Sequence, residues 1–191
     1  RLAGQALHGR VGEHLFPVWT GTGANGKGTA YGAINFALGD YAISIDPDLL
    51  LQRDRGAHPT GLMDLRGVRW AVASETNDGR KLDEALMKRL TGGDPIRARY
   101  MHRDFVEFEP QHQLVYVTNH LPGVRGDDPA TWRRVRVVPF DVVVPPDQRD
   151  RIPAVVEAAV APLPMLANGK VDRLGADALV RAAVADACTD T

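Results

Sequence analysis

The sequence predicts an α/β domain whose central sheet is mostly parallel. Short apolar runs typical of buried strands alternate with helical stretches as far as Phe140. One of these runs, Phe16–Thr20, leads into the glycine-rich loop Gly21–Gly28, and the helical stretch Thr29–Leu38 follows it. A strand, a glycine loop and a helix in this order are the context that a phosphate-binding loop requires, so we expect a P-loop fold.

The other elements are expected in alternation along the chain. Asp46 and Pro47 are typical of a helix cap and a first helical residue, and Gly92-Gly93 closes a short helix over Leu82–Leu90. Ile96–Met101 and Phe105–Phe108 are expected to pair as a β-hairpin. The remaining expectations are a helical lead-in at 2–15, strands at Tyr41–Ile45, Val68–Ala73, Leu114–Thr118 and Val135–Phe140, a loop at 53–64, and helical stretches near 48–52, Ile152–Ala161 and Asp177–Ala187.

The composition is that of a globular domain. Apolar residues make up 44% of the 191 residues, which is ample for a buried core. Lys and Arg number 23 against 24 Asp and Glu, so nucleic acid would have to be bound by a local basic patch. The single cysteine, Cys188, excludes a disulfide framework, and the histidines lack metal-ligand spacing. Because no apolar run reaches membrane-spanning length and no signal peptide opens the chain, we expect a cytoplasmic protein without membrane contact.

The glycine-rich loop predicts a nucleotide site. The pattern G-x-x-x-x-G-K lets successive backbone N–H groups wrap a phosphate, and the helix that follows adds donors and a favourable dipole. Lys27 is expected to neutralise the β- and γ-phosphates of ATP. Gly28 stands where a Ser or Thr normally ligates Mg²⁺, so Thr29 or a water is expected in that role; the alternative is a glycine loop with a chance lysine. The candidate nucleotide-binding residues are Gly21, Thr22, Gly23, Ala24, Asn25, Gly26, Lys27, Gly28 and Thr29.

Two later strands end in polar residues that suit catalysis beside such a loop. Glu75 follows the run Val68–Ala73, and an acid there can hold Mg²⁺ or polarise the attacking water. Asn119 follows Leu114–Thr118, and its amide can hydrogen-bond both the γ-phosphate and the water. The alternatives are a solvated loop glutamate and a turn-forming asparagine.

Two adjacent arginines, Arg133 and Arg134, precede the last expected strand. One of them offered to a neighbouring subunit's γ-phosphate would stabilise the charge of the transition state. The alternative is a surface pair, or one arginine stacked on Trp132. The sequence does not distinguish between the two arginines.

A basic stretch surrounds the expected hairpin. Between Arg80 and Arg103 there are seven Lys or Arg against three acids. Arg97 and Arg99 fall on one face of a strand, and His102 and Arg103 occupy the tip. A cationic hairpin of this kind suits a single-stranded phosphate backbone, with Tyr100 or Phe105 available for stacking; the alternative is a solvated hairpin without a partner.

Taken together, these segments resemble a known family. Over roughly residues 2–150, the order of motifs resembles the superfamily 3 helicase domain of phage and plasmid primases, which is related to poxvirus and satellite-phage replication proteins. The segments that carry the resemblance are Gly21–Thr29, Ala73–Glu75, Leu90–Arg99, Phe108–Pro110, Val117–Pro122 and Trp132–Val135.

The resemblance implies an AAA-like core with an inserted β-hairpin, a homo-hexameric ring, and ATP- and Mg²⁺-dependent translocation on single-stranded DNA. It makes Lys27 the Walker A lysine, Glu75 the Walker B acid and Asn119 the sensor, with Arg133 or Arg134 acting in trans. The residues that match the pore hairpin are Arg97, Arg99, His102 and Arg103.

The same resemblance implies a domain organisation. Residues 1–14 are then the end of an upstream helical domain, 15–140 the ATPase core, and 141–191 a short C-terminal helical tail. We therefore expect a fragment of a primase-helicase whose primase module lies upstream. Two rival hypotheses remain: a nucleotide- or DNA-binding module whose P-loop has decayed at Gly28, and a ring ATPase that remodels protein.

Overall fold

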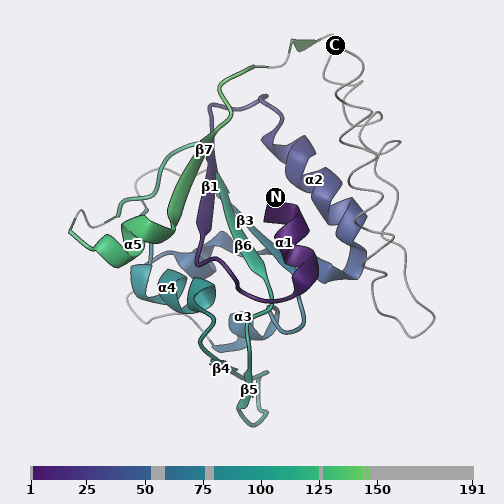
Figure 1. Cartoon of the computed structure of the whole chain (residues 1–191), viewed down its shortest axis with the longest axis vertical. Coiled ribbons are helices and arrows are strands. Elements are labelled where there is room, and N and C mark those ends of the chain that lie inside the picture. Colours follow the sequence, from purple (N-terminus) through teal and green to yellow (C-terminus); the bar gives the residue numbers. More distant parts are fainter. Residues whose placement is uncertain (1, 53–58, 76–79, 125–126, 144, 147–191) are drawn as a thin grey trace.

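A parallel β-sheet forms the centre of the computed structural model, which describes residues 2–52, 59–75, 80–124, 127–143 and 145–146 (Figure 1). The sheet has five strands in the order β2-β3-β6-β1-β7, and every neighbouring pair is parallel. The α/β fold with a mostly parallel sheet is thus confirmed. The strands are β1 (Phe16–Thr20), β2 (Ala42–Ile45), β3 (Trp70–Glu75), β6 (Gln113–Thr118) and β7 (Val135–Pro139).

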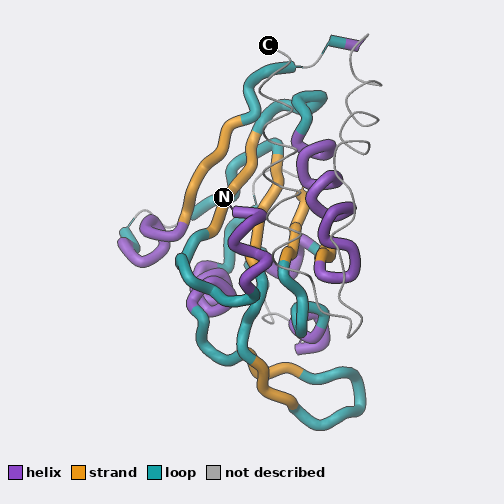
Figure 2. Tube along the Cα trace, turned by 45° about the vertical axis from the view of Figure 1, so that its right-hand side comes forward, coloured by secondary structure: helices purple, strands orange, loops and turns teal. Residues whose placement is uncertain are grey.

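Helices cover both faces of this sheet, as the tube in Figure 2 shows. One face buries Trp70, Val72 and Val117 against α1 and α2, and the other buries Ala71, Ala73 and neighbouring residues against α3 and α4. The alternation of side chains along each strand separates the two cores. The helices are α1 (Leu2–His8), α2 (Lys27–Leu38), α3 (Pro59–Met63), α4 (Glu84–Gly92) and α5 (Pro129–Arg134), with 3₁₀ turns η1 (Gly39–Tyr41) and η2 (Pro47–Leu50).

Capping side chains set several of these boundaries. The Asp46 carboxylate accepts from the backbone N–H of Asp48 at 2.9 Å, so the predicted cap is confirmed, although the turn that follows is 3₁₀. The Asp83 carboxylate accepts from the N–H of Leu86 at 2.9 Å and starts α4 at Glu84, two residues later than predicted. Helix α4 ends at Gly92 and is capped by Gly93, whose φ of 84° is a left-handed conformation that favours glycine.

Two helices were not predicted. The expected loop at 53–64 contains α3, whose Leu62 and Met63 are buried in the core, while residues 53–58 lie outside the described part. Helix α5 occupies the segment that leads into the last strand. Asp128 caps it by accepting from the N–H of Ala130 at 2.9 Å, and Pro129 is its first residue. The Asp-Pro pair at 46–47 has the same pattern, so the signal for α5 was present in the sequence.

A two-stranded antiparallel sheet projects from the end of the molecule opposite the β1–α2 loop (Figures 1 and 2). Its strands, β4 (Ile96–Ala98) and β5 (Val106–Phe108), are shorter than predicted, and Arg97 pairs with Glu107. The lead-in helix is also shorter, because α1 ends at His8 before Gly9. The predicted tail helices Ile152–Ala161 and Asp177–Ala187 lie outside the described residues, and no described helix is long and apolar enough to cross a membrane.

His112 is a buried titratable group next to α4. Its side chain is 3% exposed, and desolvation lowers the pKa of its imidazole to about 4. The backbone of Leu90 opposes this lowering, but neither ring nitrogen is in hydrogen-bond geometry with a partner. The folded state therefore disfavours the charged imidazole.

We expect acid to destabilise the fold through His112. The folded pKa of about 4 lies below the ordinary value of 6.5. The stability that the neutral imidazole contributes is therefore fully present above pH 6.5 and is lost as the pH falls towards 4. The difference corresponds to about 3 kcal/mol in the free energy of unfolding. Urea unfolding of the wild type and His112→Leu across this range measures it. An equal pH dependence in the two proteins would contradict the assignment.

Candidate functional site

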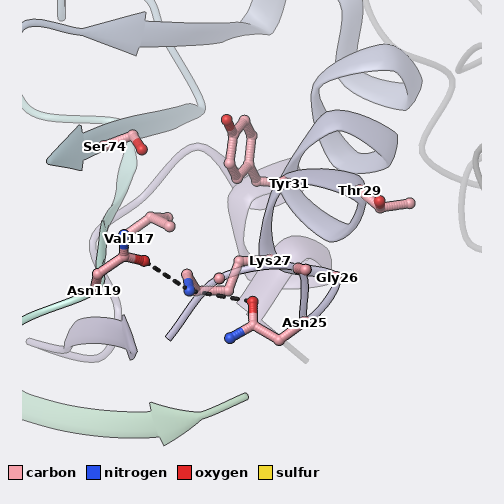
Figure 3. Close-up of a pocket in the computed structure, with 11 residues that line it drawn as sticks. Asn25, Gly26, Lys27, Thr29, Tyr31, Ser74, Val117 and Asn119 are labelled. Carbon is pink, nitrogen blue, oxygen red and sulfur yellow. Dashed lines mark hydrogen bonds between the residues drawn. The ribbon is translucent and has the colours of Figure 1, made fainter. Parts of the chain in front are cut away.

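A pocket opens at the carboxyl ends of β1, β3 and β6, the edge at which open α/β sheets bind ligands. The glycine loop between β1 and α2 forms one wall, and the ends of β3 and β6 form the other (Figure 3). The residues that line it are Gly23, Ala24, Asn25, Gly26, Lys27, Gly28, Thr29, Tyr31, Ser74, Val117 and Asn119. Most of the predicted nucleotide-binding residues therefore surround one cavity.

The loop needs glycine for two different reasons. Gly26 has a φ of 82°, which L side chains rarely adopt, and its carbonyl accepts from the N–H of Ala30 at 2.9 Å to open α2. At Gly21 the reason is close approach, because a Cβ there would collide with the Asn25 side chain and the Phe140 carbonyl. These constraints fix the path of the backbone around the pocket.

Lys27 is the centre of the pocket. Its side chain is only 7% exposed, and its Nζ donates to the Gly21 carbonyl at 2.6 Å, to Asn25 Oδ1 at 3.1 Å and to Asn119 Oδ1 at 3.2 Å (Figure 3). An ammonium has three N–H donors, so these contacts satisfy it. All of the acceptors are neutral oxygens. Burial lowers the pKa of Lys27, because the charged form has lost water.

Asn25 links the loop to the end of the neighbouring edge strand, β7. While its Oδ1 accepts from Lys27, its Nδ2 donates to the Phe140 carbonyl at 2.8 Å. Phe140 follows β7, and its own N–H donates to the Thr20 carbonyl at 2.8 Å. The position of Lys27 is thereby tied to the end of β7.

The predicted strand-end residues lie at neighbouring strand ends. Asn119 follows β6, where the Thr118 hydroxyl donates to the His120 carbonyl at 2.7 Å and turns the chain. Glu75 is the last residue of β3, and its backbone is in register with Thr118. The side chain of Glu75 lies outside the part that the structure describes. Lys27 and Asn119 are thus in contact, and the backbone of Glu75 lies one strand away from Asn119.

Figure 3 distinguishes the hydroxyl groups around the pocket. The side chain of Thr29, an expected Mg²⁺ ligand, points away from Lys27 and Asn119. The hydroxyl of Ser74 points towards the pocket from the opposite wall, and Tyr31 also lines the pocket. Ser74 and Tyr31 were not predicted. Ser74 could have been found from its position directly before Glu75, on the face of β3 that period-2 alternation turns towards α2.

The two arginines differ in their surroundings. Arg134 is partly buried, and its Nη1 donates to the Ala130 carbonyl one turn earlier at 2.8 Å. It also lies against α4, since a Cβ built on Gly92 would be 3.9 Å from its Nη2. Arg133 is exposed on α5. Neither arginine lines the pocket of its own chain.

The β4–β5 sheet carries a cationic and aromatic surface. Arg97 and Arg99 share a face as predicted, and their Cζ atoms lie 4.8 and 4.7 Å from the ring centroid of Phe105. Tyr100 and Phe105 are exposed in the connecting loop. His102 has a positive φ of 56°, which places it in a tight turn with Arg103. In Figure 1 the β4–β5 sheet lies at the end of the molecule opposite the β1–α2 loop.

The chain is similar to one protein family and to several viral proteins. Residues 19–134 match the model described as "Family of unknown function (DUF5906)". The chain is 34% identical over 141 residues to a protein of Acanthamoeba polyphaga mimivirus named "putative helicase", a match that spans 73% of this chain and 15% of that protein. It is 36% identical over 129 residues to a "putative helicase" of Frog virus 3, spanning 64% of this chain and 13% of that protein.

A primase also appears among the relatives. The chain is 28% identical over 127 residues to a "putative primase" of African swine fever virus, covering 65% of this chain and 13% of that protein. Its fold is similar to the apo structure of the NrS-1 C-terminal region, with a TM-score of 0.61, 15% identity, and coverage of 95% of this chain and 46% of that one. The chain thus spans only a small part of these viral relatives. Because the family model covers more than half of its residues, the chain belongs to the DUF5906 family, whose relatives here carry helicase and primase names.

Proposed function

We propose that this chain is the ATPase motor of a DNA helicase, within a longer primase-helicase protein. The observation that carries the proposal is the buried Lys27 ammonium in a glycine loop, 3.2 Å from the Asn119 amide oxygen at the end of a neighbouring strand. The names of the viral relatives support a role in replication. Assignment to superfamily 3 rests on the order of the motifs.

The electrostatics of the loop favour a phosphate. Neutral oxygens surround the Lys27 ammonium, so a positive charge remains that burial leaves poorly solvated. The first turn of α2 adds unpaired backbone N–H groups and the positive end of its dipole. An anion that enters the pocket neutralises the Lys27 charge and interacts favourably with the positive end of the α2 dipole. Its charged oxygens bind Lys27 more strongly than neutral carbonyls do. The β- and γ-phosphates of ATP would thus replace Gly21 and Asn119 as partners of Lys27.

Hydrolysis would then use the ends of β3 and β6. Asn119, once released from Lys27, can donate to the γ-phosphate and orient the attacking water. Glu75 would polarise that water and take part in holding Mg²⁺. The protein's contribution is positioning and charge stabilisation, because phosphoryl transfer needs little covalent chemistry from the enzyme.

The arrangement of α5 suggests that a second subunit completes the site. We assign the finger to Arg133, because Arg134 is held by the Ala130 carbonyl and by packing against α4. Since Arg133 does not line its own chain's pocket, it would act on a neighbour's γ-phosphate, in a homo-hexameric ring. The β4–β5 surface would track single-stranded DNA, with Arg97 and Arg99 beside an exposed ring that can stack on bases.

One observation favours a second candidate function, a nucleotide-binding module without turnover. Gly28 has no hydroxyl and the Thr29 side chain points away, so the usual Mg²⁺ ligand of the loop is missing. Measurement of Mg²⁺-dependent phosphate release, with and without single-stranded DNA, separates the two functions. Turnover supports the motor, and nucleotide binding without turnover supports the decayed module.

Replacing Lys27 tests the nucleotide site. In Lys27→Ala we expect ATP affinity to fall about ten- to a hundredfold, the cost of losing a hydrogen bond to a charged group, and hydrolysis to be lost. Lys81→Ala is the matched control, because Lys81 is exposed and outside the pocket. Fluorescent-nucleotide binding and phosphate release provide the two measurements. Wild-type affinity and turnover in Lys27→Ala would show that the site is elsewhere.

The neighbouring arginines form a natural pair of variants. Arg133→Ala in the full-length protein is expected to lower hydrolysis about a thousandfold with an unchanged Tm, since the finger acts only in the transition state. Arg134→Ala is expected to lower the stability by about 1 kcal/mol through its lost hydrogen bond. Phosphate release and thermal unfolding measure both effects. If Arg133→Ala hydrolyses ATP normally while Arg134→Ala does not, the assignment is reversed.

Salt dependence tests the DNA-binding surface. Arg103→Ala is expected to weaken binding to a single-stranded oligonucleotide and to reduce the slope of log K against log salt concentration by about 0.7, the value for one lost phosphate contact. Arg66→Ala, an exposed arginine next to α3, serves as the control. Equal affinities and equal slopes for the two variants would exclude Arg103 from the DNA contact.

A further inference from the structure

The glycine loop lacks the hydroxyl group that usually binds a divalent cation beside the nucleotide. Gly28 replaces the residue that normally supplies a hydroxyl, and Thr29 points away on the far side of α2 (Figure 3). Among the described residues, no group of three or more His, Cys, Asp and Glu side chains could hold a metal ion. A Mg²⁺ ion usually keeps several waters and binds through the substrate phosphates and only one or two protein oxygens.

Ser74 is placed to supply one of these oxygens. It continues the face of β3 on which Trp70 and Val72 are buried against α1 and α2, so period-2 alternation directs it to the α2 side. Its partner in register is Val117 of β6, which lines the same pocket. Unlike Trp70 and Val72, Ser74 is exposed, because the strand here reaches the open edge of the sheet.

The space between Ser74 and the loop is suited to an ion. Figure 3 shows the Ser74 hydroxyl directed into the pocket, on the opposite wall from the loop residues. A Cβ built on Gly28 meets no atom within 4 Å, so this part of the loop borders open space. Tyr31, four residues after Lys27, lies on the same face of α2 and lines the pocket between the two walls. The Ser74 hydroxyl offers an oxygen, the ligand type that Mg²⁺ prefers.

We infer that the Ser74 hydroxyl is a direct ligand of the Mg²⁺ that binds with the nucleotide, and that it replaces the hydroxyl that Gly28 lacks. The inference rests on the proposed nucleotide site. A strand residue on the opposite wall thus takes over a role that P-loops usually give to the residue after the lysine. Thr29 has no part in it, and Glu75 keeps both of its proposed roles, with the water and with Mg²⁺.

The first test measures how nucleotide binding depends on Mg²⁺. A fluorescent, non-hydrolysable ATP analogue is titrated into the wild type and Ser74→Ala at increasing Mg²⁺ concentrations and in EDTA. We expect Ser74→Ala to need about tenfold more Mg²⁺ for half-maximal binding, the change for one lost ligand worth about 1.4 kcal/mol, with unchanged affinity in EDTA. Ser44→Ala, an exposed serine on β2, is the matched control, and Thr29→Ala tests the rival ligand.

The second test changes the chemistry of the ligand. Ser74→Cys places a sulfur atom where Mg²⁺ would need oxygen, so binding is expected to respond weakly to Mg²⁺ and to be restored by Cd²⁺, which prefers thiolate. The controls are the wild type, whose one cysteine is Cys188, and Ser44→Cys. They measure the effect of Cd²⁺ on nucleotide binding that does not depend on a thiol at position 74. Circular dichroism establishes that each variant is folded. If Ser74→Ala does not fold, the response of Ser74→Cys to Cd²⁺ tests the inference by itself.

The outcomes separate this inference from the proposed function. A wild type that binds no nucleotide, with or without Mg²⁺, would refute the nucleotide site itself. A wild type that binds with Mg²⁺ while Ser74→Ala needs no more of the ion would overturn the role of Ser74 and leave the nucleotide site standing. A shift in Thr29→Ala but not in Ser74→Ala would assign the ligand to Thr29. Selective rescue of Ser74→Cys by Cd²⁺ supports direct coordination.

Discussion

The geometry of the pocket is arranged around the buried Lys27 ammonium. The Lys27 ammonium is held by neutral oxygens from the start of its loop, from Asn25 and from the end of β6. A charge that has lost water is tolerated only if its donors are satisfied, and each acceptor must then be in place. The loop glycines, the parallel pairing of β1 with β6 and the turn after Thr118 are what bring these acceptors together. The same arrangement leaves a charge that a phosphate can neutralise.

The order of the strands places the Lys27 loop in contact with the ends of two neighbouring strands. Because β1 lies between β6 and β7, the loop that follows β1 contacts the ends of both neighbours. Asn119 is the contact on one side, and Asn25 reaches the Phe140 carbonyl on the other. Strand β7 follows directly after α5, which carries Arg133 and Arg134. A movement of α5 and β7 would therefore change the surroundings of Lys27. In the proposed function, this movement would couple a neighbouring subunit to the nucleotide.

Much of this could be predicted from the sequence, because the signals are local. The glycine loop, the Asp46 cap and the strand that ends at Thr118 each depend on a few adjacent residues, and the structure has them where they were expected. Helix α5 was missed although Asp128 and Pro129 repeat the local pattern of Asp46 and Pro47. What the sequence does not show is its stabilisation by contacts distant in sequence, such as the Thr131 hydroxyl donating to the Glu84 carboxylate at 2.8 Å. The different burial of Arg133 and Arg134 could not be predicted, because the sequence shows only two adjacent arginines. In a helix, neighbouring residues point to different sides. Only the packing against α4 shows which of the two sides is covered. The roles of Lys27, Glu75, Asn119, the two arginines and the β4–β5 surface stay predictions.

The most direct test of the account is a crystal structure of the chain with Mg²⁺ and a non-hydrolysable ATP analogue. We predict that the β- and γ-phosphates lie within the loop Gly21–Gly28, and that Lys27 Nζ has left Asn119 and the Gly21 carbonyl to bind phosphate oxygens. A nucleotide bound elsewhere, or a Lys27 that keeps its bond to Asn119 with nucleotide in the pocket, would contradict the account.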